Sequence, residues 1–116
     1  MNEGNITLAP LLTAGGQPKL RPALILRKMP GFGDYLVCGI STQLHQEVEG
    51  FDIVLSDSDH EFPDTGLRQT SLVRLSYLAS VPAKKLPGKM GSIPSRMLSE
   101  LQNRLSAHLT LESNGD

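Results

Sequence analysis

Short apolar runs separated by turn-forming residues occupy most of the chain, and this pattern predicts β-strands. The strongest run covers residues 19–26 (KLRPALIL) and follows the turn sequence GGQP. A second run covers residues 34–44, after the turn sequence MPGFG at 29–33. Shorter runs lie at residues 6–12, 51–55, 71–75 and 79–82, whereas residues 84–92 are rich in turn formers. We therefore expect five or six short strands.

The last part of the chain has a different period. Its apolar residues recur at helical spacing, and they are Met97, Leu98, Leu101, Leu105 and Leu109. This stripe predicts an amphipathic helix over about residues 95–109, beginning at Pro94 or Ser95. We expect residues 110–116 to form a frayed tail. Strands followed by one C-terminal helix predict a mainly β protein of the α+β class, a small curled barrel with a helix packed on it.

The two strongest runs are predicted to pair as an antiparallel hairpin. If residues 29–33 form the loop, Lys28 lies opposite Asp34 and the numbers of paired residues add up to 62. Arg21 then falls opposite Ser41, with Cβ atoms about 5 Å apart, unless a bulge shifts the register. The face that carries these two residues has charged ends and small side chains, so we expect it to be open to a ligand. The opposite, more apolar face is expected to be the core.

The composition is that of one globular domain, with 39% hydrophobic and 20% charged residues in 116. The single cysteine, Cys38, cannot form an internal disulfide and is expected to pack in the core of a protein from a reducing compartment. The N-terminus lacks the basic and apolar segments of a signal peptide, and no apolar run approaches the roughly 18 residues of a membrane helix. We therefore expect a cytoplasmic protein with no membrane association.

Charge is segregated along the chain although the net charge is only −1. Residues 65–99 contain six Lys or Arg and no acid, whereas residues 47–64 contain seven acids and no Lys or Arg. A near-neutral total is therefore compatible with a local positive surface that binds a polyanion. The alternative is that the charges mix in three dimensions.

Several segments together resemble the MazF/PemK/Kid family of toxins from toxin–antitoxin systems. They are GNI at residues 4–6, LRPALIL at 20–26, ISTQL at 40–44, TGLRQTSLVR at 65–74 and KMG at 89–91. The resemblance covers nearly the whole chain in order. It implies an SH3-like barrel of five to seven short antiparallel strands with a C-terminal helix, in a homodimer. It also implies an endoribonuclease that cleaves single-stranded RNA without a metal or another cofactor, and a cognate antitoxin as partner.

The resemblance assigns roles to individual residues. The arginine before the proline, here Arg21, is implied to be catalytic, and Ser41 is implied to help hold the scissile phosphate. We predict that Thr42, Gln43, Lys19 and Gln17 bind the substrate. A guanidinium is always charged and matches a phosphate with its planar donors, so Arg21 can stabilise the negative charge of the transition state.

Alternatives remain open at each of these positions. Arg21 could form a surface ion pair, and Ser41 and Thr42 could be ordinary polar strand residues. The general base is unidentified, with His45, Glu47 and Asp52 as candidates by sequence proximity only. Residues 57–61 (DSDHE) mix carboxylates and histidine, but they lack the glycine and distal Glu of a calcium loop, which favours a solvated loop.

One departure from the family bears on activity. Many members carry a Glu shortly before the Arg-Pro strand, whereas residues 13–19 contain no acid here. An alternative function is therefore a catalytically weakened or inactive relative that binds a nucleic acid or a partner protein. Related barrels also act on DNA gyrase instead of RNA, and identification of the target separates that case.

Overall fold

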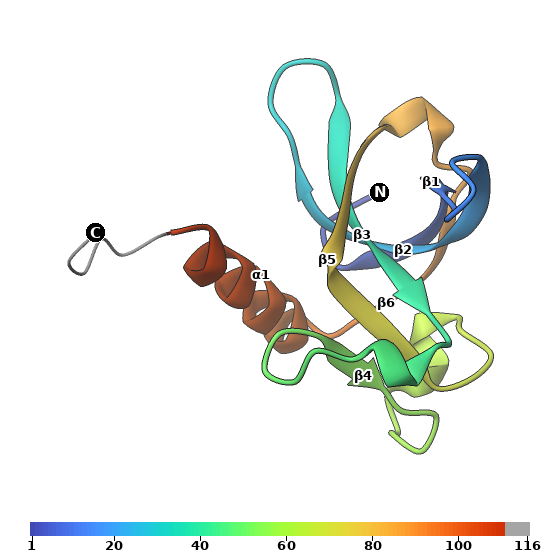
Figure 1. The fold of residues 1–116 in the computed structure, drawn as a ribbon, viewed down its shortest axis with the longest axis vertical. Coiled ribbons are helices and arrows are strands. Elements are labelled where there is room, and N and C mark those ends of the chain that lie inside the picture. The colour runs from blue at the N-terminus through green and yellow to red at the C-terminus, as the bar shows by residue number, and fades with distance from the viewer. Residues whose placement is uncertain (111–116) are drawn as a thin grey trace.

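The computed structural model describes residues 1–110, which form six strands, one α-helix and three short 3-10 turns (Figure 1). The strands are β1 (Asn5–Leu12), β2 (Pro18–Lys28), β3 (Asp34–Ser41), β4 (Ile53–Leu55), β5 (Ser71–Pro82) and β6 (Lys89–Ser92). The 3-10 turns are η1 (Leu44–Gln46), η2 (Phe62–Thr65) and η3 (Ala83–Lys85). The helix α1 (Ser95–Leu109) covers the range that the apolar spacing predicts. Of the predicted tail, residues 111–116 lie outside the described part of the chain.

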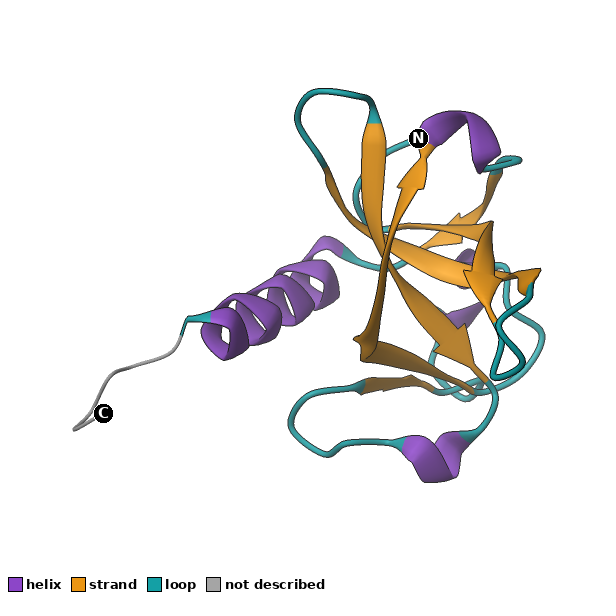
Figure 2. Ribbon diagram, turned by 45° about the horizontal axis from the view of Figure 1, so that its top comes forward, coloured by secondary structure: helices purple, strands orange, loops and turns teal. Residues whose placement is uncertain are grey.

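All six strands belong to one antiparallel sheet, in the order β4-β5-β3-β2-β1-β6. The sheet curls strongly into a half-barrel, and α1 lies on its outside (Figure 2). The predicted mainly β fold with a C-terminal helix is thus confirmed. Within residues 1–110, no helix is long and apolar enough to cross a membrane.

Two strand predictions are wrong. Residues 71–82 form one continuous strand, β5, and not two. In β5, Arg74 pairs with Gly39 and Leu78 pairs with Cys38, so the intervening residues 75–77 bulge out of the ladder. The polar residues of the bulge interrupt the apolar pattern, and the sequence therefore predicts two strands instead of one. Residues 89–92, which read as turns, form the edge strand β6 because they pair with β1.

The β2–β3 hairpin follows the predicted register only at the end of the ladder that lies away from the turn. Ala23 pairs with Gly39, as predicted, but Lys28 pairs with Tyr35 and not with Asp34, because the register shifts between Ile25 and Arg27. The β2–β3 ladder ends at Ala23, so Arg21 and Ser41 are not paired with each other. Their pairing partners are Ala9 in β1 and Leu72 in β5.

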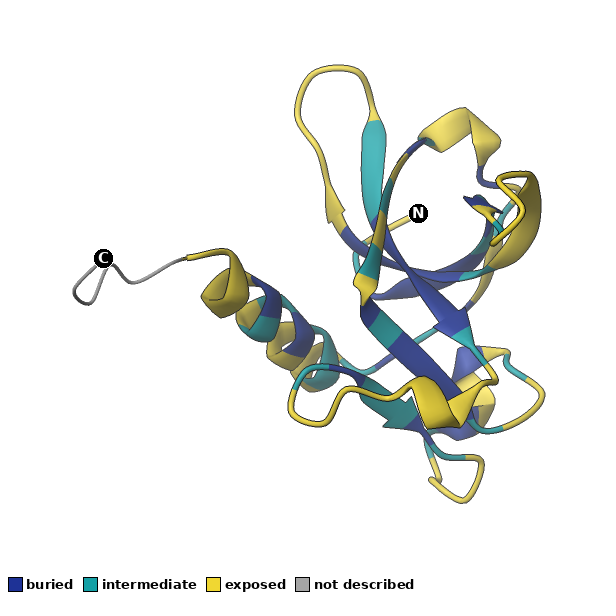
Figure 3. Cartoon of the chain, in the orientation of Figure 1, coloured by how far each residue is buried: buried dark blue, intermediate teal, exposed yellow. Residues whose placement is uncertain are grey.

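The sheet buries apolar side chains on both faces (Figure 3). The face predicted to be the core packs against Leu101 and Leu105 of α1, and it includes Cys38. The face predicted to be open is buried at its centre, where Ala23 and Ile25 are fully inaccessible to solvent. That prediction fails at the centre of the face, because the curl of the sheet covers it there with β1 and the end of β5 and forms a second apolar cluster. At the ends of the face, Arg21 and Arg27 are exposed, as predicted.

Two glycines bring η2 and β6 together. A Cβ on Gly91 would lie 2.3 Å from the backbone oxygens of Asp64 and Thr65, and one on Gly66 would lie 2.3 Å from the Met90 oxygen. Gly66 also has a φ of 74°, a conformation that side chains disfavour. The Thr65 hydroxyl donates to the Phe62 oxygen and accepts from the Leu67 N–H. The resulting close backbone contact holds the following loop, which carries Arg68, at the rim of a cavity.

Candidate active site

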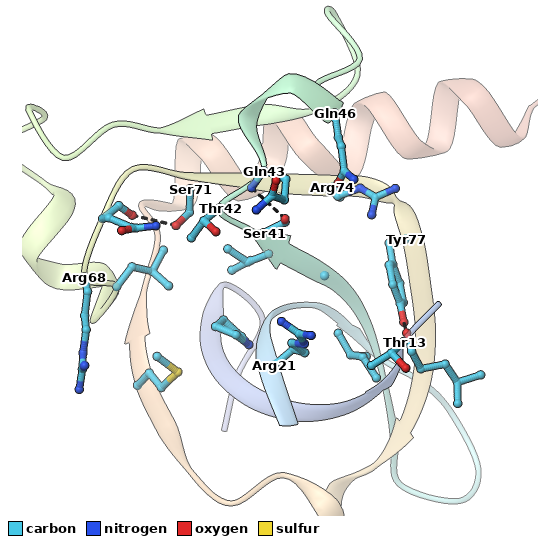
Figure 4. A pocket seen from close by; sticks show the side chains of 18 of the residues that line it. Thr13, Arg21, Ser41, Thr42, Gln43, Gln46, Arg68, Ser71, Arg74 and Tyr77 are labelled. Atoms are coloured by element: carbon cyan, nitrogen blue, oxygen red, sulfur yellow. Dashed lines mark hydrogen bonds between the residues drawn. The ribbon is translucent and has the colours of Figure 1, made fainter. Parts of the chain in front are cut away.

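A cavity of about 680 Å³ opens on one side of the curled sheet. Its walls come from the β1–β2 hairpin, the end of β3 with the chain that follows it, residues 66–71, and the middle of β5. Arg21, Ser41, Thr42 and Gln43 all line it. Figure 4 shows Arg21 near the middle, the three residues from the end of β3 on one side, and Tyr77 on the adjacent wall. Although β2 and β3 are not paired at Arg21 and Ser41, both residues line the same cavity.

Arg21 is available to an anion. Within residues 1–110, the ion pairs join Arg27 to Glu3, Arg96 to Glu61 and Arg104 to Glu100, and none involves Arg21. The alternative of a surface ion pair for Arg21 is therefore not seen in the described part of the chain. A guanidinium without a carboxylate partner can offer all its donors to a ligand.

Ser41 shapes the wall above Arg21. Its Oγ accepts a hydrogen bond of 3.0 Å from the Gln43 N–H, and this bond turns the chain at the end of β3. The turn brings Thr42 and Gln43 to the cavity, and η1 then adds Gln46. The Ser41 hydroxyl hydrogen remains able to donate to a ligand because Oγ uses only a lone pair in this bond.

The other two predicted substrate-binding residues lie outside the cavity lining. The Gln17 carbonyl accepts from the Thr13 N–H at 2.9 Å and closes the exposed β1–β2 turn. Lys19 pairs with Leu11 on the same hairpin and is exposed. Both residues are close in sequence to residues that do line the cavity, Thr13 and Arg21.

None of the three candidate general bases lines the cavity. His45 and Glu47 are exposed at η1, and Asp52 is 3% exposed. The Asp52 carboxylate accepts from the Val48 N–H and the Leu75 N–H, both at 2.9 Å. It therefore fixes the chain between β3 and β4 against β5, which is a structural role.

The cavity residues that the sequence analysis missed include Arg68, Arg74 and Tyr77. The Nε of Arg74 is buried and has no hydrogen-bond partner, and the guanidinium carbon lies 5.8 Å from the centre of the Tyr77 ring. The excess of basic residues after residue 64 was a signal for the two arginines. The position of Tyr77 depends on the β5 bulge, which no sequence pattern predicts.

The charged side chains that line the cavity in the described chain are all positive. Among its lining residues in the described chain, three are arginines and none is Asp, Glu or His. Such a surface favours an anionic ligand, and arginine donors match phosphate oxygens.

The acidic loop at residues 57–61 forms no metal cluster. Across residues 1–110, no three His, Cys, Asp or Glu side chains gather as a metal site. Glu61 instead accepts two hydrogen bonds from the Arg96 guanidinium, and these hold the pKa of Glu61 below its usual value. The remaining residues of this segment are exposed, as expected for a solvated loop.

Comparison with known sequences assigns the family. The sequence pattern of the PemK-like, MazF-like toxins of type II toxin–antitoxin systems matches residues 2–109. The chain belongs to this PemK/MazF toxin family. No curated protein matches the sequence.

Solved structures of the PemK/MazF family share the fold at low sequence identity. The Mycobacterium tuberculosis toxin MazF-mt6 is 22% identical with a TM-score of 0.65, over 93% of this chain and 98% of that one. A MazE–MazF structure from Deinococcus radiodurans is 18% identical with a TM-score of 0.65, over 97% of each chain. An endoribonuclease in complex with its cognate antitoxin from a mycobacterial species is 16% identical with a TM-score of 0.66, over 97% of each chain.

Proposed function

We propose that this PemK/MazF protein is a toxin that cleaves single-stranded RNA without a metal ion. The observation that supports the proposal is the cavity that Arg21 and Ser41 both line. Arg68 and Arg74 also line this cavity, and no carboxylate is among its described lining residues. RNA is a polyanion with a reactive hydroxyl beside each phosphate, so a positive cavity with hydroxyl donors suits both its binding and its cleavage.

The proposed chemistry is transfer of the phosphate to the neighbouring ribose oxygen. The 2′-oxygen attacks phosphorus, its proton passes to solvent, and the bond from phosphorus to the 5′-oxygen breaks. The departing 5′-oxygen takes up a proton, and the products are a 2′,3′-cyclic phosphate and a 5′-hydroxyl. Arg21 stabilises the negative charge that gathers on the phosphate oxygens, and Ser41 donates a second hydrogen bond to them.

The remaining contacts extend from this centre. In the proposal, Thr42 and Gln43 hold the nucleotides next to the cleaved bond because they line the cavity beside Ser41. Lys19 and Gln17 contact RNA that continues along the exposed β1–β2 hairpin.

A protein partner completes the proposal. Two similar structures are a MazE–MazF structure and an endoribonuclease in complex with its cognate antitoxin, and we propose that this chain likewise binds a cognate antitoxin. In this proposal the active toxin is a cytoplasmic homodimer.

The direct test is incubation of the protein with single-stranded RNA in excess EDTA. The proposal predicts cleavage with 2′,3′-cyclic phosphate ends, which mass spectrometry of the products identifies. A single 2′-deoxy substitution at the cleaved nucleotide should abolish cleavage there, because it removes the nucleophile. Products with a linear 5′-phosphate, or cleavage at the deoxy position, would contradict the proposed chemistry.

The second candidate function is a binding protein without catalysis. It is favoured by one observation, that no Asp, Glu or His lines the cavity in residues 1–110 to accept the 2′-hydroxyl proton. This candidate predicts that the protein binds RNA or an antitoxin but leaves RNA intact in EDTA and in magnesium alike. The same incubation therefore separates the two functions.

A further inference from the structure

Strand β5 departs from regular pairing at the wall of the cavity. Arg74 and Leu78 pair with the neighbouring residues Gly39 and Cys38, so residues 75–77 are extra in β5. A bulge bends its strand and re-aims the side chains that it carries. Tyr77 is the last residue of this bulge, and its ring lines the cavity (Figure 4).

The ring of Tyr77 is held in place from two directions. A Cβ on Gly39 would lie 3.4 Å from Cγ of Tyr77, so the ring rests directly on the Gly39 backbone. The Tyr77 hydroxyl donates to the carbonyl oxygen of Leu12 at the end of β1. An aromatic side chain with two torsions that is fixed in this way needs little further ordering to bind a ligand.

The surroundings of the ring indicate what it binds. Among the described residues that line the cavity, Tyr77 is the sole aromatic. The guanidinium carbon of Arg74 lies over the ring, 5.8 Å from its centre, so a flat group that stacks on the ring has a positive charge close to it. A nucleotide combines these two features, because its base is planar and aromatic and its phosphate is an anion. Single-stranded RNA is commonly bound by stacking of bases on aromatic side chains.

We propose that Tyr77 is a base-stacking residue that holds one nucleotide of the RNA beside the Arg21–Ser41 centre. This inference rests on the proposed function, because it assumes RNA in the cavity. It assigns to Tyr77 a role in binding, with its greatest effect on KM and Kd. A purely structural role is the competing explanation, since Tyr77 also packs on the second apolar cluster.

The experiment measures RNA binding by fluorescence anisotropy under conditions in which cleavage cannot occur. The probe is a labelled single-stranded RNA of mixed sequence with 2′-O-methyl riboses, and a series of probes places one abasic nucleotide at each position in turn. The expected result is a loss of about tenfold in affinity at one abasic position, which is typical of a stacked base. Tyr77→Leu should weaken binding of the intact RNA by the same factor and show no further loss at that position.

Tyr35 provides a matched control. It also packs on the second cluster, its hydroxyl donates to the Met1 carbonyl at 3.3 Å, and it does not line the cavity. Tyr35→Leu and Tyr77→Phe should both keep the wild-type pattern of abasic penalties. A Tyr77→Leu protein with the wild-type pattern would overturn the proposal, and so would a wild-type protein that is insensitive to every abasic position.

A second measurement does not require removal of the Tyr77 ring. The sequence contains two tyrosines and no tryptophan, so the emission of a Tyr35→Phe variant comes from Tyr77 alone. Intact RNA should quench this emission, and the abasic RNA of the sensitive position should not; equal quenching by both would contradict stacking.

If the wild type binds RNA but never cleaves it, the proposed chemistry fails while both binding tests of Tyr77 still apply. If it binds no RNA, both proposals fail.

Discussion

The two arginines of β2 show how surroundings separate side chains of the same type. Arg27 forms an ion pair of 3.2 Å with Glu3, where the backbone N–H groups of Glu3 and Lys28 also hold the pKa of Glu3 below its usual value. Arg21, at the other end of the strand, lines the cavity and is absent from the ion pairs of residues 1–110. The charge of Arg27 is thus balanced within the chain, whereas that of Arg21 is left for a ligand.

Cys38 should be chemically inert in the folded protein. Burial, and secondly the charge of Asp52, raise the pKa of the Cys38 thiol to about 12, so almost no thiolate exists near neutral pH. A thiol reagent such as DTNB should therefore react with less than about 5% of the protein in native buffer and with one thiol per chain in denaturant. Rapid stoichiometric reaction in native buffer would contradict the burial of this side chain.

Asp52 should contribute to stability and not to the chemical step. Asp52→Ala leaves the buried Leu75 N–H and the part-buried Val48 N–H without an acceptor, and we expect a loss of about 2 kcal/mol in the free energy of unfolding. Urea denaturation measures this loss. The exposed neighbour Glu47 is the control, since Glu47→Ala should change the same free energy by less than about 0.5 kcal/mol. Equal values for the two variants would remove the structural role of Asp52.

At the scale of elements, the sequence predicts what depends on local pattern. The helix Ser95–Leu109 follows from the spacing of its leucines, and the pairing of residues 23–25 with residues 37–39 follows from the position of the turn. The pattern does not reveal bulges, because an extra residue changes the register without changing composition. The shift after Ile25 and the bulge at residues 75–77 therefore had to come from the structure. Edge strand β6 was missed because its four residues gain their order from pairing with β1.

The contact between η2 and β6 should be intolerant of any added atom. Gly91→Ala places a Cβ within 2.3 Å of two backbone carbonyls, so η2 must move away from β6. We expect a loss of at least about 3 kcal/mol in the free energy of unfolding, measured by urea denaturation. Gly15→Ala is the matched control, because its Cβ would lie 3.9 Å from the Thr13 hydroxyl and should cost less than about 1 kcal/mol. A Gly91→Ala variant as stable as the control would show that this contact is not tight.

In the whole molecule, the fold gathers basic residues from separate segments around one cavity and leaves the acidic segment outside its lining. Arg21 comes from β2, and Arg68 and Arg74 come from the basic second half of the chain. The acids of residues 47–64 stay out of the cavity lining, so the alternative, mixing of opposite charges, does not occur there. The Arg-Pro motif of the sequence identified Arg21, whereas the gathering of all three arginines at one cavity depends on the curl of the sheet.

Affinity for RNA should fall with salt because phosphate contacts dominate binding. If the three cavity arginines each neutralise a phosphate, log K against log salt should have a slope of about −2 or steeper for single-stranded RNA. Arg68→Ala should make the slope shallower by about 0.7, and Arg27→Ala should leave it unchanged. Anisotropy titrations between about 50 and 300 mM salt give these slopes. A slope near zero would mean that the cavity does not bind the phosphates.

Comparison of two arginines of one strand tests whether Arg21 stabilises the phosphate during cleavage. The measurement is kcat/KM for cleavage of a fluorogenic single-stranded RNA in EDTA by the wild type, Arg21→Ala and Arg27→Ala. Removal of Arg21 should lower kcat/KM about a hundredfold or more, mostly through kcat, while both variants keep the wild-type unfolding curve. Arg27→Ala should stay within about threefold of the wild type, since it loses only an exposed ion pair. An Arg21→Ala protein that cleaves RNA at the wild-type rate would contradict the proposed role of Arg21.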